Sequence, residues 1–446
     1  MSLGFYAWGE PLFVFVMMFS IITDYICGFC VSKSKEKGNN KVAKGFVIAS
    51  IVTNLLILGF FKYSNFIIEN LRAIPFLSSL PPVVLDFHLP IGISFYTFQT
   101  MSYVIDIYRG DAKVEKNITS FGMFVALFPQ LVAGPIIRFK DLAAQINDRK
   151  ESFALFGEGV RRFLLGFSKK VLLANNMALI ADRAFTMGDG ERSVIYAWLG
   201  AIAYAFQIFF DFSGYSDMAI GLGRMFGFKF LENFDYPYIS ASVSEFWRRW
   251  HISLGRWFRD YVYFPLGGSR VNSISRLMFN LFVVWFLTGV WHGASWNFII
   301  WGLMYFVLIV FEKVSGYPKK FKLKPAKIAY RTFTLLCVLG GWVIFRSPGM
   351  RAALDYGASM FAMRDNPIIC DNVIYTLREY GVFLIFSILC STLVFKKLSG
   401  HLQNSGSRFI RVAVNTMRIA VLVFCSLWSI SFIVLGAHNP FIYFHF

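Results

Sequence analysis

The chain has 446 residues, of which 56% are hydrophobic, 19% aromatic and 16% charged. Soluble domains carry about 25% charged residues, so this composition excludes an ordinary soluble protein and predicts one embedded in lipid. The net charge of +18 raises the alternative of nucleic-acid binding, but the Lys and Arg residues cluster between apolar runs, where anionic lipid headgroups account for them, and we expect no nucleic-acid partner.

Apolar runs along the chain predict an all-α, polytopic membrane protein. A bilayer core about 30 Å thick requires about 20 helical residues, and because several runs are shorter or longer, we expect tilted, broken or re-entrant segments. With no internal repeat or soluble domain evident, residues 1–446 are expected to form a single integral membrane domain. The runs fit spans at Phe5–Val31, Ala43–Asn65, Ile91–Tyr108, Val194–Gly221, Leu277–Phe311, Thr332–Phe345, Gly381–Phe395 and Val412–Leu435, with less regular stretches at Phe121–Ile137 and Phe163–Ile180.

The distribution of Lys and Arg predicts the orientation of these spans. By the positive-inside rule the basic connections lie in the cytoplasm, and the alternating, less basic connections lie outside. The C-terminal residues 439–446 are then expected to emerge outside. The basic connections are Lys33–Lys44, Arg109–Lys116, Arg138–Lys170, Arg224–Arg276, Lys313–Arg331 and Lys396–Arg411.

The six cysteines do not predict a metal centre. Cys27 and Cys30 have the spacing of a redox motif, but they lie at the end of an apolar run, and no second pair accompanies them. We expect all six to be small packing residues and no metal to be bound.

Three segments place proline, glycine or carboxylates inside apolar stretches. Leu89–Gln99 is expected to pack against other helices through its hydroxyl and amide side chains. Phe128–Arg138 contains two prolines and a glycine, which predict a re-entrant loop rather than a through-going helix. Asp211 and Asp217, with Tyr215 between them, need partners or solvent. Either carboxylate could orient a histidine or hold an arginine, and we expect all three residues to support a site rather than to react.

The segment Glu245–Tyr261 predicts an interfacial helix. At about 100° per residue, its four arginines fall on one arc and its aromatic residues on the opposite arc. The arginines are expected to face the cytoplasm and anchor the helix at the lipid surface. Alternatively, they bind the phosphates of an anionic donor such as coenzyme A. His251 falls on the buried side. The four arginines are Arg248, Arg249, Arg256 and Arg259.

His292 is the most informative residue of the chain, because it lies deep in the apolar run Leu277–Phe311. An ionisable side chain in lipid is a functional-site hypothesis by default. Both flanks of the run are basic and predicted to be cytoplasmic, so the chain must enter and return, with a turn near Gly289–Gly293. The alternative is a histidine hydrogen-bonded within a helix bundle beside two tryptophans.

Two long segments resemble the membrane-bound O-acyltransferases, and more narrowly the branch that includes the bacterial alginate O-acetylation membrane protein. They are WHISLGRWFRDYVYFPLGG (250–268) and TGVWHGASWNFIIWG (288–302), and residues 89–110, 127–139 and 210–228 fit the same branch. The D-alanyl-transferring branch of teichoic acid modification differs in the residues that follow the Trp-His-Gly element. Members usually have a further hydrophobic helix before the stretch 2–8, so the first family helix is expected to be missing here.

The resemblance implies a ring of about 10–12 tilted transmembrane helices with re-entrant segments around a central funnel or tunnel. His292 matches the signature histidine, His251 matches the second characteristic position, and Trp291 and Asn297 are expected to support them. The implied reaction takes acetyl from a cytosolic thioester, with acetyl-CoA as the expected substrate and no bound cofactor. An extracytoplasmic SGNH-type acetyltransferase is the expected partner, a polysaccharide the final acceptor, and the bacterial cytoplasmic membrane the location.

Histidine suits this chemistry because its ordinary pKa of about 6.5 allows it to act as a base or a nucleophile. We expect His292 to be the general base for the acceptor hydroxyl, or to carry the acetyl group briefly. His251, with Asp211 or Asp217, would position substrate or orient the ring. Two other functions stay open at this point: D-alanyl transfer from a carrier protein, and a transporter whose buried polar residues form a permeation path.

Overall fold

The computed structural model describes residues 1–78, 84–86, 88–132, 134–188, 190–405, 407–436 and 441, with the backbone alone at Asn147. Within these residues every regular element is helical and there is no strand. Nine helices of the described part are long and apolar enough to cross a membrane. The prediction of an all-α, polytopic membrane protein is therefore confirmed.

The first half of the chain forms helices α1 to α10 with two short irregular turns. Their bounds are α1 (Ser2–Gly9), α2 (Phe13–Glu36), α3 (Asn40–Arg72), η1 (Pro75–Leu77), α4 (Ile93–Arg109), α5 (Ile118–Ala126), α6 (Phe128–Leu131), α7 (Phe139–Asn147), α8 (Phe153–Ser168), η2 (Lys169–Ala174), α9 (Asn175–Thr186) and α10 (Val194–Met225).

The second half holds the two histidine segments and the C-terminal helices. Its elements are η3 (Pro237–Ile239), α11 (Val243–Arg249), α12 (Ile252–Phe258), η4 (Arg259–Tyr263), α13 (Ile274–His292), α14 (Trp296–Ser315), α15 (Lys324–Arg346), α16 (Met350–Met360), α17 (Asp371–Cys390), α18 (Val394–Gln403) and α19 (Arg408–Val434).

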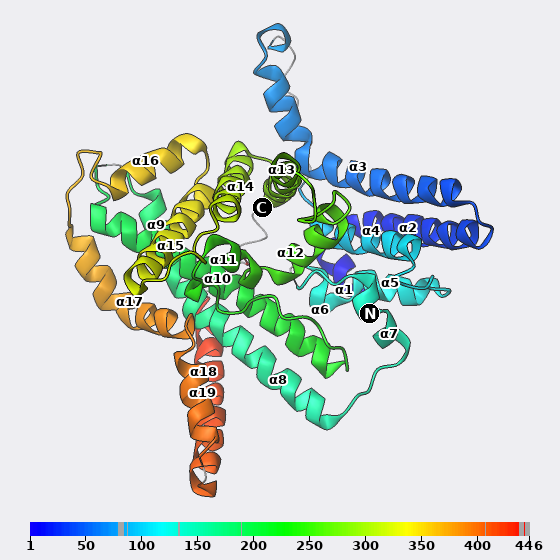
Figure 1. The fold of residues 1–446 in the computed structure, drawn as a ribbon. Helices are drawn as coiled ribbons and strands as arrows, with labels where there is room; N and C mark the ends of the chain where they lie inside the picture. The colour runs from blue at the N-terminus through cyan, green and yellow to red at the C-terminus, as the bar shows by residue number, and fades with distance from the viewer. Residues whose placement is uncertain are drawn as a thin grey trace.

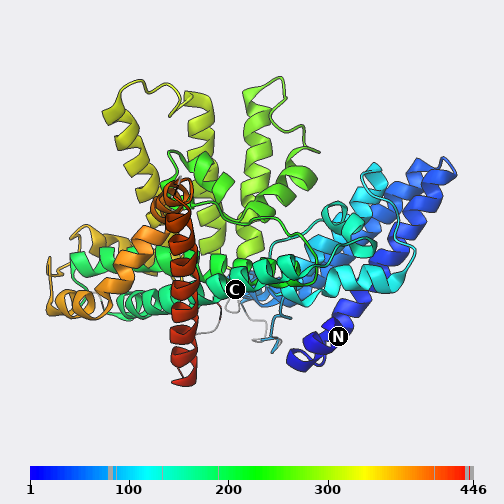
Figure 2. The same ribbon diagram turned by 90° about the horizontal axis from the view of Figure 1, so that it is seen from below.

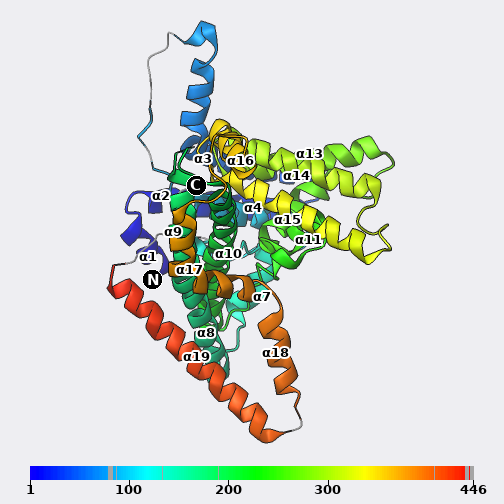
Figure 3. The ribbon, with the colours of Figure 1, turned by 90° about the vertical axis from the view of Figure 1, so that its left-hand side faces the viewer.

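The helices are arranged in three groups around the histidine segments. Helices α2, α3 and α4 pack together on one side, and α8, α9 and α10 form a layer through the middle (Figure 1). Helices α13, α14 and α15 rise steeply from that layer (Figure 2). Helices α18 and α19 extend away from the body (Figure 3). The candidate site lies where α13 ends near the middle layer.

The layer of α8 and α10 depends on glycine at four positions. A Cβ on Gly166 would lie 2.4 Å from the backbone oxygen of Gly214, and one on Gly159 would lie 2.6 Å from that of Gly221. Small residues allow helix backbones to approach closely in membranes, where packing rather than water drives association. The predicted apolar stretch Phe163–Ile180 belongs to a long helix that runs from α8 through η2, a π-helical turn, into α9.

Two predicted spans have different limits in the structure. The run Phe5–Val31 is divided, because α1 ends at Gly9 and α2 begins only at Phe13, after Pro11, which lacks a backbone N–H. The run Gly381–Phe395 is displaced: α17 begins at Asp371 and ends at Cys390, where a turn separates it from α18. The second span was placed too late in the sequence because Arg378 and Glu379 lie within the first half of α17.

The segment Phe128–Arg138 is not one helix, as its prolines predicted. Helix α5 ends before it, α6 has Pro129 in its first turn, and an extended stretch leads to Arg138. Gly92, with φ of 76°, immediately precedes α4 and lies beside this segment. A Cβ on Gly92 would lie 2.5 Å from the backbone oxygen of Leu131. Glycine is required at this position because the backbone is left-handed and the neighbouring chain is close.

Two of the six basic connections lie on the same face of the molecule. Figure 2 shows the turn between α2 and α3 and the connection between α14 and α15 on the same side, with α1 on the opposite side. These two connections contain the basic segments Lys33–Lys44 and Lys313–Arg331. This arrangement is the one that the positive-inside rule requires for a shared cytoplasmic face. The C-terminal residues 437–440 and 442–446, predicted to emerge outside, are not among the described residues.

Candidate active site

The run Leu277–Phe311 enters and returns as two helices, as its basic flanks predicted. Helix α13 ends at His292 and α14 begins at Trp296, so the turn falls at residues 293–295 and begins with Gly293, the second of the glycines expected to mark it. A Cβ on Gly289 would lie 2.5 Å from the oxygen of Phe298, and one on Gly302 would lie 2.5 Å from that of Trp285. Glycine therefore allows the two helices to pack in direct backbone contact.

His292 lies in an aromatic enclosure at the end of α13, with 5% of its surface exposed. Its ring meets Trp291, Trp301 and Phe345 edge to face, with ring centroids 4.9, 5.0 and 5.3 Å away. Such contacts fix a ring in place and exclude water from it. The imidazole is thus held in a largely apolar setting, where a proton transfer does not compete with bulk solvent.

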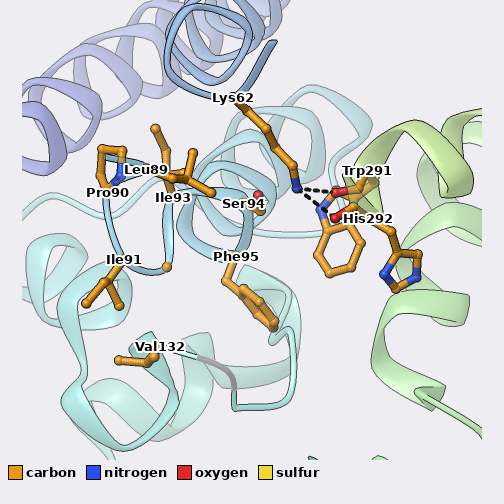
Figure 4. Close-up of a pocket in the computed structure, with 11 residues that line it drawn as sticks. Lys62, Leu89, Pro90, Ile91, Ile93, Ser94, Phe95, Val132, Trp291 and His292 are labelled. Carbon is orange, nitrogen blue, oxygen red and sulfur yellow. Dashed lines mark hydrogen bonds between the residues drawn. The ribbon is translucent and has the colours of Figure 1, made fainter. Parts of the chain in front are cut away.

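Helix α3 supplies the hydrogen-bond donors that the end of α13 lacks. The last carbonyls of a helix have no partner within it. Lys62 Nζ donates to the oxygens of Trp291 at 2.6 Å and His292 at 3.2 Å, and the Tyr63 hydroxyl donates to the oxygen of Val290. Figure 4 shows Lys62 reaching across to both oxygens. The rings of Trp291 and His292 leave the end of the helix in two different directions.

A small cavity adjoins this helix end. Its volume is about 60 Å³, enough for a few water molecules, and Lys62, Trp291 and His292 form one wall. The opposite wall comes from the segment before α4 and from Val132, as Figure 4 shows. The cavity lies on the side of the predicted extracytoplasmic connection 71–89. On the side away from the cavity, Trp301 and Phe345 pack on the His292 ring. An acyl donor that approached the ring from that side would therefore require these two side chains to move.

His251 lies at a break that the sequence pattern did not predict. The expected continuous helix over Glu245–Tyr261 is wrong: α11 ends at Arg249, α12 begins at Ile252, and His251 between them has φ of 45°. This left-handed conformation is uncommon outside glycine and turns the chain sharply. The helical arrangement nevertheless predicted its burial correctly, because the side chain is 2% exposed.

Asn233 holds His251 in this strained position. The Asn233 Oδ1 atom lies 3.2 Å from His251 Nδ1 and accepts hydrogen bonds from the backbone N–H and the hydroxyl of Ser253. The other ring nitrogen, Nε2, is buried with no hydrogen-bond partner in the described structure. Burial lowers the pKa of His251 to about 3, so the ring is neutral at any physiological pH.

Trp291 joins the two histidines into one site. Its ring centroid is 5.9 Å from that of His251 and 4.9 Å from that of His292. Phe95 and Phe98 pack on the same indole, which carries the cluster to α4. The structure therefore brings together His251 from one segment selected in the sequence analysis with Trp291 and His292 from another.

The two aspartates of α10 are held by cations from the neighbouring α8 and η2. Asp217 accepts from Arg162 Nε at 2.8 Å and from Lys169 at 2.6 Å, and Asp211 pairs with Lys170 at 2.6 Å. The sequence analysis gave these aspartates two possible roles, orienting a histidine or holding an arginine. The observed contacts are of the second kind, because each aspartate pairs with a basic side chain. Pairing of this kind makes a buried carboxylate tolerable inside an apolar segment.

The remaining supporting residues lie at helix contacts around the site. Tyr215 stacks on Phe441, with ring centroids 4.7 Å apart. The Asn297 side chain donates to the oxygen of Ser347 at 2.6 Å, which joins the start of α14 to the end of α15. The six cysteines are free thiols, and Cys27 is buried in α2.

Two of the four arginines in Glu245–Tyr261 are paired with acidic side chains. Arg249 pairs with Glu245 and Asp235, and Arg259 pairs with Asp260. A cleft of about 600 Å³ lies beside that last pair, with Arg109, Lys140, Asp111 and Asp260 in its walls. Because acids accompany the bases, this cleft carries no strong excess of positive charge.

Comparison with known proteins identifies the family. The membrane-bound O-acyltransferase (MBOAT) family model matches residues 111–346, which include both histidines. The probable alginate O-acetylase of Pseudomonas putida is 45% identical over 365 residues, which cover 81% of this chain and 73% of that protein. The peptidoglycan O-acetyltransferase of Helicobacter pylori is 33% identical over 494 aligned positions, covering all of this chain and 90% of that protein.

A more distant relative belongs to the D-alanyl-transferring branch. The teichoic acid D-alanyltransferase of Bacillus subtilis is 31% identical over 265 residues, which cover 56% of this chain and 65% of that protein. The family match, together with relatives that align over most of the chain, favours an acyltransferase over the alternative of a transporter. This chain belongs to the membrane-bound O-acyltransferase family and is a multi-pass membrane O-acyltransferase.

Proposed function

We propose that the protein takes an acetyl group from cytosolic acetyl-CoA and passes it across the bacterial cytoplasmic membrane for O-acetylation of an exopolysaccharide or cell-wall polymer. Two relatives, a probable alginate O-acetylase and a peptidoglycan O-acetyltransferase, support this acceptor class. The D-alanyltransferase aligns over a smaller share of the chain, which favours acetyl over aminoacyl transfer.

The observation that carries the proposal is the enclosed His292 beside a small cavity. In the transfer step, the imidazole takes the proton of the acceptor hydroxyl while that oxygen attacks the thioester carbonyl carbon. The carbon–sulfur bond then breaks, and the leaving thiolate takes up the proton from the imidazolium. The acceptor is acetylated and free coenzyme A leaves, so His292 returns to its starting state.

The enclosure around His292 serves this chemistry in two ways. Aromatic contacts from Trp301 and Phe345 hold the ring in one orientation, and a positioned base contributes far more than a mobile one. The small cavity admits a hydroxyl and few waters, so hydrolysis of the acetyl group is disfavoured. In this proposal His251 positions substrate near the base, with its Nε2 atom as the contacting group.

The cavity beside His292 is small, and in this proposal the immediate acceptor is therefore a hydroxyl presented by a carrier narrower than a polymer chain. We propose that an extracytoplasmic SGNH-type acetyltransferase completes the transfer to the polymer. The arginines Arg248 and Arg256, which lie on the cytoplasmic segment that carries His251, would attract the phosphates of the donor.

Turnover of labelled acetyl-CoA by the purified protein tests the proposal. Wild-type protein should release coenzyme A and transfer label to an acceptor, and His292→Ala should reduce this by about 1,000-fold, the middle of the range for general-base catalysis. Lys44→Met, a change at an exposed position on α3, is the matched control and should keep full activity. Label accepted only from a charged carrier protein, or equal turnover by folded His292→Ala, would contradict the proposal.

A further inference from the structure

Lys62 has no role in the sequence-based site, yet its side chain donates hydrogen bonds to the end of α13. It comes from the middle of an apolar helix, where a lysine is costly and needs a reason. Its ammonium contacts the oxygens of Trp291 and His292 and lies 5.8 Å from the Trp291 ring. One residue thus touches the backbone of both site residues and the ring that joins the two histidines.

The position of His292 makes this contact important. His292 is the last residue of α13, so the chain leaves the helix at Gly293 and no following turn restrains the imidazole. Three carbonyls in this last turn, at residues 290, 291 and 292, receive their donors from Lys62 and Tyr63. The backbone from which the catalytic ring projects is therefore fixed by α3 rather than by its own helix.

Charge adds to the hydrogen bonds. The C-terminal end of a helix carries partial negative charge, and a cation there is stabilising, more strongly when partly buried. Further along α3, the indole N–H of Trp296 donates to Asn70 at 2.9 Å, so the same helix also holds the start of α14. Helix α3 thereby braces both sides of the turn that carries His292.

We propose that Lys62 is a positioning residue for acetyl transfer: its ammonium holds the end of α13 so that the His292 imidazole stays aimed at the reacting groups. The ammonium has three N–H donors, and two are used by the carbonyls. The third is free to face the cavity that Lys62 and His292 share, where an acceptor oxygen would lie. This inference rests on the proposed function and names a residue that the reaction depends on.

Steady-state kinetics with labelled acetyl-CoA distinguishes positioning from a structural role. Lys62→Met keeps the side-chain length but removes the charge, and it should lower kcat by about 100-fold, the cost of misplacing a reacting group by about 1 Å. The KM for acetyl-CoA should stay within about threefold of the wild-type value, because donor binding does not involve Lys62. Lys44→Met on the same helix is the control and should leave both constants unchanged.

Chemical rescue removes the ambiguity of a folding defect. Lys62→Cys should be as impaired as Lys62→Met, and alkylation with 2-bromoethylamine, which restores an ammonium at nearly the same length, should recover at least about a tenth of kcat. Alkylation with iodoacetamide adds no charge and should recover nothing. Wild-type protein treated with each reagent controls for the six native cysteines.

The outcomes separate this inference from the proposed function. An active wild type together with a Lys62→Met variant within threefold of it in kcat would overturn the role of Lys62 alone. Equal recovery by both alkylating reagents would do the same, since charge would then be irrelevant. A wild-type protein that does not consume acetyl-CoA would overturn the proposed function and this inference with it.

Discussion

The two histidines of the site are both buried, but the chain holds them by opposite means. His292 ends a regular helix and is enclosed by three aromatic rings, with its backbone fixed from α3. His251 lies in a left-handed break between two short helices, and its own ring is hydrogen-bonded to Asn233. The first residue has a fixed backbone beside a cavity, and the second has a fixed ring with one free nitrogen.

This difference indicates different duties within one site. A ring whose Nδ1 is fixed by a hydrogen bond presents Nε2 in a constant direction, which suits the binding of a substrate group. A ring enclosed by aromatic edges has no polar partner to compete with an incoming hydroxyl, which suits a base. Under the proposed function we therefore expect His292 to transfer the proton and His251 to position substrate.

The largest expected effect comes from removing both histidines in a double-mutant cycle. His292→Ala should lower acetyl transfer by about 1,000-fold and His251→Ala by about 100-fold, as expected for a base and a positioning group. Because both act in one step, the double variant should be no worse than about threefold below His292→Ala alone. Losses that multiply to the product of the two single effects would show that the residues act in separate steps.

The sequence was sufficient to predict the class of fold, the burial of the two histidines and the turn that carries His292. Those features are local: hydropathy gives the spans, and basic flanks on both sides of one apolar run force it to return. The break at His251 was missed because the helical wheel assumes an unbroken helix, and nothing in Glu245–Tyr261 except Gly255 interrupts the pattern.

The residues that hold the site could not be chosen from the sequence, because they come from distant segments. Lys62 lies 230 positions before His292, and Asn233 lies 18 before His251 with a turn between them. The only local signal was a lysine inside the predicted span Ala43–Asn65, which is costly in lipid and marks a position with a partner. The cations that pair with Asp211 and Asp217 likewise come from another helix.

A smaller effect is expected from removing the support of His251. Asn233→Leu keeps the number and branching of the side-chain heavy atoms but removes the oxygen shared by His251 and Ser253. It should lower acetyl transfer by about 10- to 100-fold, as the loss of a residue that orients a metal-ligating histidine does. Asn176→Leu is the matched control, because Asn176 is also buried but bonds only to the Leu172 carbonyl of its own helix segment. Activity should be unchanged in Asn176→Leu, and similar losses in both variants would remove the assigned role of Asn233.

The smallest effect concerns the pH dependence of stability. Burial lowers the pKa of His251 to about 3, whereas an unfolded histidine has a pKa of about 6.5. Above pH 6.5 the ring is neutral in both states and contributes no pH dependence; below it, the unfolded chain binds a proton that the folded one does not, so stability falls. Between pH 6.5 and pH 5 this residue lowers the free energy of unfolding by about 2 kcal/mol.

Thermal unfolding in detergent at pH 5 and pH 8 measures this effect. The difference in unfolding temperature between the two pH values should be smaller for His251→Gln than for the wild type. An equal difference in the two proteins would mean that the His251 ring is protonated in the folded state, and the argument that it presents a neutral Nε2 to substrate would then fail.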